Sequence, residues 1–285
     1  RWFLVVAVMS SITAVSIDSF VKNTLTSWIF GFLITLIFFV SIFLHEYAHA
    51  VMARIEGIQV LEIVLHPFGG LARFKREPDT PRAEFRIAIA GPAASFLLSV
   101  FFVGLMAIAN SYELDILSKL LFMLALLNFL LAVFNMFPGY PLDGGRVLRA
   151  YLWRRGKDLN EATILTGRFG QIIGASLIGF GVFIALLRGD LLNGFWTMLV
   201  GLFLFDAARG IIKEIEALEN LSVEEVMLLP VSVAPDADIQ HFVDRILTFH
   251  RQEIFPVAKE RQLYGMLNLE DLKLSLIHIS QGIVR

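Results

Sequence analysis

The sequence has no cysteine and little charge for its length. Of its 285 residues, 18% are charged and 56% are hydrophobic, whereas a soluble domain carries about 25% charged residues. The absence of cysteine excludes disulfides, thiolate zinc sites and iron–sulfur clusters, so any metal must rest on His, Asp or Glu. The low charge excludes an ordinary soluble enzyme and a disordered chain. The sequence also lacks a dense basic face, which excludes nucleic acid as a partner.

The sequence contains several long apolar runs without charged residues. A bilayer core about 30 Å thick requires roughly 20 apolar residues per helix. We expect six membrane spans, at 2–17, 28–44, 87–109, 120–142, 169–187 and 191–205. The second run continues through His45 to about Ala53. The sequence therefore predicts an all-α, multi-pass (polytopic) protein of the lipid bilayer.

Basic residues are unevenly divided between the predicted loops. The connections 54–86 and 144–167 hold six and five basic residues, whereas the opposite loops hold only Lys22 and Arg188. Because basic loops stay on the cytoplasmic side, we expect both termini and both long connections to face the cytoplasm.

The connection 54–86 contains a predicted β-hairpin. A β-prone run at 59–65 is followed by the turn Pro67–Gly70 and a second run at 71–74. Strand-forming runs separated by Pro and Gly are typical of two strands joined by a turn. We expect this hairpin to lie at the membrane surface.

The composition changes near the end of the sixth run. We expect a transmembrane domain over 1–208, a charged helical linker over 209–220 and a small α/β module over 221–285. In the module, apolar periodicity predicts a helix over 236–250. The predicted strands are 231–233, 255–257 and 263–267.

His45, Glu46 and His49 are the most informative residues of the chain. Residues four apart share one helix face, so both imidazoles can bind one metal with Glu46 beside them. Histidine ligands without cysteine suit Zn²⁺, and an adjacent carboxylate can take a proton from metal-bound water. Ionisable groups that end an apolar helix are costly unless they pair or function. The alternative is a polar helix end at the membrane interface.

Two histidines leave a zinc site one protein ligand short, and Asp143 is the best candidate for the third. It ends the fourth run, on the same side of the membrane as His49. Pro138, Pro141 and Gly144 break the helix there, which frees backbone groups that need a watery or protein-lined cavity. The alternative for Asp143 is a turn or cap residue in an Asp-Gly loop.

Two motifs together resemble the site-2 protease family of intramembrane zinc metalloproteases. They are H-E-x-x-H at 45–49 and the later pattern Asn135-x-x-Pro138-x-x-x-Leu142-Asp143-Gly144. The turn Pro67–Gly70 and the segment Ala90–Pro92 also match, and the likeness covers most of 1–208.

This resemblance implies roles for the matching residues. His45, His49 and Asp143 would bind one Zn²⁺ per chain. Glu46 would activate the attacking water, and Asn135 would help to hold the substrate or the oxyanion. The expected substrate is a membrane-tethered protein, such as a transcription regulator, and the expected location is the prokaryotic cell membrane.

Residues 221–274 resemble one cystathionine-β-synthase-type (CBS) repeat. The likeness rests on Leu221–Met227, Val231–Asp236, Phe255–Val257 and Leu263–Gly265. Such repeats normally work in pairs that often bind ATP or another adenine nucleotide, which implies nucleotide regulation and a homodimer through the CBS modules. Since one repeat is present, we expect that 282–285 opens a second, truncated repeat. The alternative is an α/β appendage without a ligand.

A function of a different class is a CBS-regulated transporter or channel, in which the intramembrane charges would line an ion path. A third alternative is a catalytically dead scaffold. The two histidines at i and i+4, with a carboxylate between them and Asp143 at matching depth, favour the protease.

Overall fold

The computed structural model of the chain divides into two units, Arg1–Glu219 and Asn220–Arg285. It describes residues 2–66, 69–220, 222, 231–250, 252–260 and 262–270. The predicted turn residues Pro67 and Phe68, most of the segment 221–227 and the final residues 282–285 lie outside the described residues.

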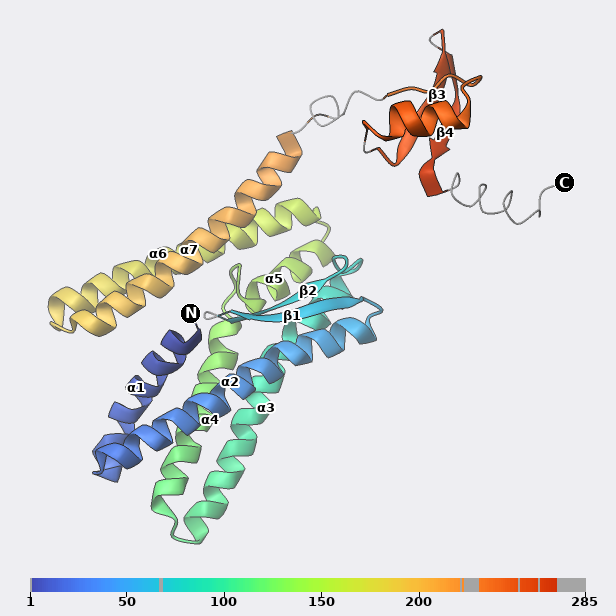
Figure 1. The fold of residues 1–285 in the computed structure, drawn as a ribbon. Helices are drawn as coiled ribbons and strands as arrows, with labels where there is room; N and C mark the ends of the chain where they lie inside the picture. Colours follow the sequence, from blue (N-terminus) through green and yellow to red (C-terminus); the bar gives the residue numbers. More distant parts are fainter. Residues whose placement is uncertain are drawn as a thin grey trace, which may run out of the picture. The chain divides into compact units, whose positions relative to one another are not determined.

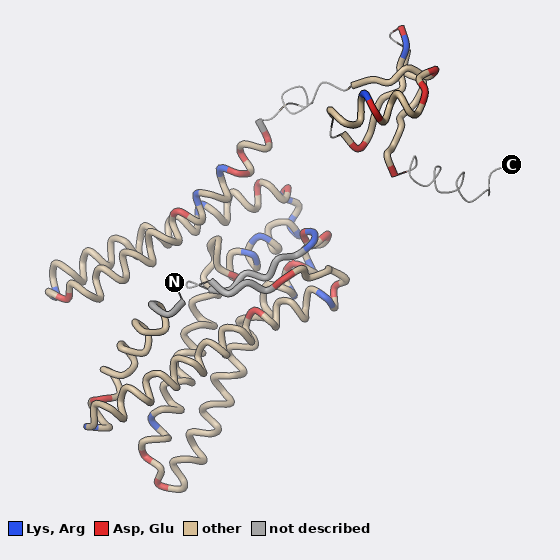
Figure 2. Tube along the Cα trace, in the orientation of Figure 1, with Lys and Arg blue, Asp and Glu red and all other residues tan. Residues whose placement is uncertain are grey.

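Long apolar helices form the first unit (Figure 1). They are α1 (Trp2–Val21), α2 (Thr24–Ile55), α3 (Pro81–Ser111), α4 (Asp115–Asn135), α6 (Leu159–Leu187) and α7 (Leu191–Asn220), with the short α5 (Asp143–Arg154) between α4 and α6. Helix α3 packs along α4, and α2 packs along both α1 and α3. Figure 2 shows that charged residues gather near the helix ends and leave most of each helix uncharged.

Five helices are long and apolar enough to cross a membrane, namely α2, α3, α4, α6 and α7. They correspond to the second to sixth predicted spans. The first predicted span falls on α1, whose described apolar part, Val5–Val21, is shorter. The prediction of a multi-pass integral membrane protein is confirmed, with five such helices among the described residues instead of the predicted six.

Capping residues and proline set the helix ends, which differ from the ends predicted from the apolar runs. Helix α3 begins six residues before the run 87–109, because Thr80 caps the backbone N–H of Ala83 and Pro81 occupies the first turn. Helix α4 stops at Asn135, well before residue 142. The chain then turns through 136–142, where proline prevents a continuous helix.

A shared core holds the first four helices together. It contains Ile17 of α1, Ile34 of α2, Phe102 of α3 and Leu120 and Leu124 of α4, all buried. In a bilayer, close packing of this kind holds helices together, because lipid removes most of the hydrophobic driving force between them. The three helices α2, α3 and α4 therefore keep a fixed spacing around the residues described below.

The predicted hairpin is confirmed as an antiparallel pair, β1 (Val60–His66) and β2 (Gly69–Phe74). The register pairs Val60 with Phe74 and His66 with Gly69. The hairpin contacts α2 through both strands. Its place at the membrane surface stays a prediction.

The connection 144–167 is not the open loop that the sequence predicts. It contains most of α5 and the start of α6. Arg149, counted above as a loop charge, is only 5% exposed. Helix α5 is amphipathic, and its buried face packs against α3 and α6. Arg149 can lie on that face because the carboxylate of Glu84 on α3 pairs with it.

The second unit contains two antiparallel strands, β3 (Ile254–Lys259) and β4 (Gln262–Asn268). Val233 forms a parallel bridge to Val257, and Phe242 packs edge-on against Phe255. The predicted helix 236–250 is shorter, comprising α9 (Ile239–Phe242) and a π-helical turn, η1 (Val243–Leu247). The assignment to a CBS repeat and the three-domain division stay predictions. Helix α7 continues through the predicted linker to Asn220.

Candidate metal centre

His45 and His49 lie one turn apart on the same face of α2. Each residue is 3% exposed, and their Nε2 atoms are 3.3 Å apart. The spacing of four residues in a helix produces this proximity. Both imidazoles therefore converge on one buried point, as the sequence predicts.

Asp143 completes the group from a distant part of the chain. It is the first residue of α5, and its Oδ2 lies 3.1 Å from Nε2 of His45 and 3.2 Å from Nε2 of His49. Burial raises the pKa of Asp143, but the two imidazoles beside its carboxylate outweigh burial and hold that pKa below its ordinary value. A carboxylate oxygen this close to two imidazole nitrogens is placed to act as the third ligand of a cation.

Two glycines let α5 start so close to the end of α4. A Cβ on Gly144 would lie 2.3 Å from the carbonyl oxygen of Met136, and one on Gly145 would lie 2.5 Å from Gly139. Real side chains do not tolerate such distances. The Gly-Gly pair that follows Asp143 is therefore required for the turn that brings the carboxylate to the histidines.

The three atoms fit the coordination shell of zinc. Zn²⁺ binds His nitrogen and carboxylate oxygen at about 2.0–2.2 Å in tetrahedral geometry, so neighbouring ligand atoms lie roughly 3.3–3.5 Å apart. The three distances of 3.1, 3.2 and 3.3 Å come close to that edge length. Three protein ligands leave the fourth position for water, as in catalytic zinc sites. Among the described residues, this is the one group of three His, Asp or Glu ligand atoms within 4.8 Å.

Helix α3 orients both histidine rings. Nδ1 of His49 donates to the backbone carbonyl of Ile87 over 2.7 Å, and Nδ1 of His45 lies 2.9 Å from Oγ of Ser95. Each Nδ1 contact leaves Nε2 directed toward Asp143, the usual arrangement for metal-bound histidine. Ser95 was not among the site residues that the sequence predicted. Its hydroxyl on an otherwise apolar stretch was the available signal for this role.

Gly91 of α3 lies directly beside the imidazoles. A Cβ at this position would be 2.2 Å from Nε2 of His49 and 2.6 Å from Nε2 of His45. These are close to metal–ligand distances, so a methyl group here would occupy the space that a zinc ion needs. The absence of a side chain at residue 91 keeps the centre open.

Glu46 and Asn135 are the two predicted catalytic residues. Glu46 follows His45 on α2 and is half-buried. Asn135 is the last residue of α4, is also half-buried, and its Nδ2 donates to the carbonyl of Leu131 over 3.0 Å. Their positions on the two helices that lead into the centre are compatible with the predicted roles, which stay predictions.

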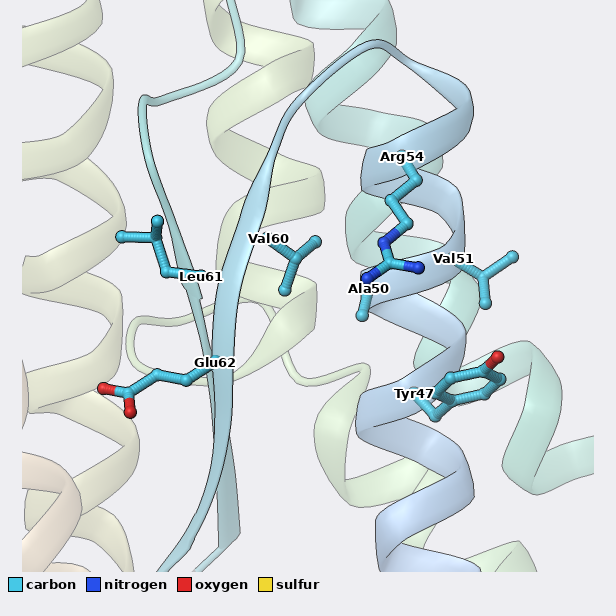
Figure 3. A pocket seen from close by; sticks show the side chains of 7 residues that line it. All are labelled: Tyr47, Ala50, Val51, Arg54, Val60, Leu61 and Glu62. Carbon is cyan, nitrogen blue, oxygen red and sulfur yellow. The ribbon is translucent and has the colours of Figure 1, made fainter.

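A hollow of about 230 Å³ lies between α2 and β1. It is lined by Tyr47, Ala50, Val51, Arg54, Val60, Leu61 and Glu62. Figure 3 shows Val60 pointing toward α2 and Leu61 and Glu62 pointing away from it. Among the described strands, β1 pairs only with β2, so its second edge has no strand partner. Tyr47, Ala50 and Val51 lie within two residues of His49 on α2, which places this hollow next to the metal-binding turn of α2.

Several known proteins are similar to this chain. The family model "Peptidase family M50" matches residues 33–115 and 103–177. "Putative zinc metalloprotease Rip3" of Mycobacterium tuberculosis is 36% identical over 254 residues, which are 86% of this chain and 64% of that protein. The chain thus spans less than two thirds of the length of that relative.

Two archaeal matches come from Methanocaldococcus jannaschii. Zinc metalloprotease MJ0392 is 33% identical over 262 residues, covering 90% of this chain and 71% of that protein. The solved structure of the site-2 protease from M. jannaschii has a TM-score of 0.49 and 25% identity, and the match covers 80% of this chain and 91% of that chain.

Proposed function

We propose that this chain, which belongs to peptidase family M50, is an intramembrane zinc metalloprotease. It hydrolyses a peptide bond within or near the transmembrane segment of a membrane-tethered protein. The observation that carries the proposal is the buried convergence of His45, His49 and Asp143 within 3.3 Å of one another. A transporter would also bury charge, but it does not need three ligand atoms at zinc spacing.

The three ligand residues and Glu46 divide the chemistry between them. When bound by His45, His49 and Asp143, Zn²⁺ supplies a Lewis acid that polarises the scissile carbonyl and lowers the pKa of water. Glu46 accepts a proton from the attacking water as the water oxygen bonds to the carbonyl carbon. Glu46 then delivers that proton to the leaving amine as the C–N bond breaks. Asn135 donates a hydrogen bond to the developing oxyanion.

Cleavage of a helical segment requires local unwinding, since the carbonyl of a helical peptide bond is already paired with an N–H. Among the described strands, β1 pairs with β2 alone, so its second edge offers a place for the unwound backbone. Strand addition there satisfies polar groups that lipid cannot. The hollow between α2 and β1 gives room for side chains of the added strand.

Proline in β1 tests this route of substrate binding. We expect Leu61→Pro to reduce cleavage about 5- to 30-fold, because proline removes a donor and one or two backbone hydrogen bonds contribute about 1 kcal/mol each. Leu61→Ala is the matched control, since Leu61 is 61% exposed and its side chain points away from α2 (Figure 3). Zinc content should stay unchanged in both variants. Loss of zinc in Leu61→Pro would make the hairpin a structural element, and unchanged cleavage would require another route.

The function itself is tested on purified protein in lipid vesicles with a single-span substrate. We expect cleavage to stop when a chelator removes the metal and to return when one equivalent of Zn²⁺ is added. Cleavage that persists after the metal has been removed would contradict the proposal. Ion flux across the vesicle membrane without any cleavage would support the transporter alternative.

We also propose an orientation in the membrane, a substrate class and a role for the second unit. The proposed orientation places both termini in the cytoplasm, and the eleven basic residues of the two long connections support it. We also propose that a transcription regulator is the substrate class and that an adenine nucleotide regulates a CBS-type second unit, with dimerisation through that unit. The bridge from Val233 to Val257 and the hairpin β3–β4 are compatible with such a module.

A further inference from the structure

A buried ion pair joins α5 to α3. Glu84 in the first turn of α3 is fully buried, and Arg149 in α5 is 5% exposed. Nε of Arg149 donates to Oε1 of Glu84 over 3.0 Å, and Nη2 donates to the same oxygen. Nε of Arg146, also on α5, lies 3.5 Å from that oxygen. Nη1 of Arg149 lies 3.4 Å from Oγ1 of Thr163 on α6. Burying two charges costs free energy that only close pairing offsets, so the position of this pair in the fold is tightly defined.

Each partner of the pair stands on a helix that forms part of the metal centre. Glu84 lies one turn before Ile87, whose carbonyl accepts the hydrogen bond from His49. The same helix carries Ser95, which contacts His45. Arg149 lies six residues after Asp143 on α5. The ion pair therefore connects the helix that orients the histidines to the helix that bears the third ligand.

The pair also contributes to the orientation of α5 about its own axis. Gly144 and Gly145 hold the start of α5 against the preceding turn. A 12-residue helix is marginal alone, so the rotation of α5 about its axis is set by its contacts with α3 and α6. Six residues correspond to about 600° of helix rotation, so Asp143 and Arg149 leave α5 in directions roughly 120° apart. Fixing Arg149 therefore helps to set the rotation of α5 and, with it, the direction of the Asp143 carboxylate.

From this arrangement we infer that Glu84 and Arg149 are positioning residues of the metal centre, which hold the carboxylate of Asp143 at ligand distance from His45 and His49. The inference rests on the proposed function in one respect, namely that these three residues bind a metal ion. The ion pair lies away from the ligands but, by orienting α5, it affects how tightly the metal is bound and in which geometry. A pair that contributed only to stability would leave both properties unchanged.

The decisive variant replaces both partners by apolar residues of similar size, Glu84→Leu with Arg149→Met. Replacing a buried ion pair in this way often preserves stability, so thermal unfolding of the metal-free protein in detergent should change little. We expect the dissociation constants for Zn²⁺ and Co²⁺ to rise about 10- to 100-fold, the usual effect of losing a residue that orients a ligand. The visible absorption bands of bound Co²⁺ should shift, because they report the ligand geometry.

Two single variants accompany the double one. Arg149→Lys keeps the charge but loses the planar fork that fixes orientation, so we expect an altered Co²⁺ spectrum and about tenfold weaker binding even if the double variant does not fold. Arg154→Met is the matched control, since it removes a cation from an exposed position on the same helix. It should bind both metals like the wild type.

The outcomes separate this inference from the proposed function. Wild-type affinity and an unchanged Co²⁺ spectrum in Arg149→Lys, or in a folded double variant, would overturn the positioning role. In that case the metal centre of the wild type would still stand. A wild-type protein that binds neither Zn²⁺ nor Co²⁺ would instead overturn the metal centre itself.

Discussion

Replacing Glu46 by glutamine should abolish proteolysis and leave zinc bound. Glutamine is close to glutamate in size but accepts no proton, so the attacking water loses its general base. Loss of a general base typically costs about 10²- to 10⁴-fold in rate. We expect at least a hundredfold slower cleavage of a single-span substrate, with one zinc per chain retained because His45, His49 and Asp143 are intact.

The matched control is Glu161→Gln, the same chemical change at an exposed carboxylate in the first turn of α6. Its cleavage rate should equal that of the wild type. If Glu46→Gln cleaved substrate at a near-normal rate, another residue would have to act as the base. If it lost zinc, Glu46 would have a structural role at the metal centre.

A single methyl group at residue 91 should destroy the metal centre. In Gly91→Ala the Cβ would lie 2.2 Å from Nε2 of His49, a distance that forces the ring to move. The ring is held by its hydrogen bond to the carbonyl of Ile87, so moving it breaks the contact that orients it. We expect zinc affinity to fall at least a hundredfold and cleavage to fall with it, measured by metal competition and by the vesicle assay.

Gly104→Ala is the control for this prediction, because a Cβ on Gly104 of the same helix meets no atom within 4 Å. Alanine is a better helix former than glycine by about 1 kcal/mol, so neither substitution should destabilise α3 by itself. Zinc loss in Gly91→Ala alone would therefore report the crowded centre and not an unfolded helix. Normal zinc affinity in Gly91→Ala would mean that the imidazoles lie elsewhere.

The sequence predicts a contact well when one regular element determines it. His45 and His49 are four residues apart on one helix, so their proximity follows from helix geometry. The hairpin is similarly local, since two strand-forming runs flank a short turn. Asp143 is 94 residues from His49, and the sequence indicates only that it ends a span on the same side of the membrane.

Contacts between helices depend on how each helix is rotated and how it is aligned with its neighbours. Neither can be inferred from the apolar runs of the sequence. Ser95 was not predicted as a site residue, yet its hydroxyl meets His45 because α3 presents that face to α2. Arg149 was counted among the loop charges, whereas α5 turns it inward onto Glu84. In each case a polar side chain on an apolar surface was visible in the sequence, but its partner lay on another helix.

The central claim is that His45, His49 and Asp143 hold one zinc ion together, and metal analysis of purified Asp143→Ala tests it most directly. Wild-type protein should contain one zinc per chain. The variant should be depleted of zinc while remaining folded, because it lacks one of three protein ligands of the site. Full zinc occupancy in Asp143→Ala would contradict the account, since the metal would then be held without the ligand that the structure brings to the histidines.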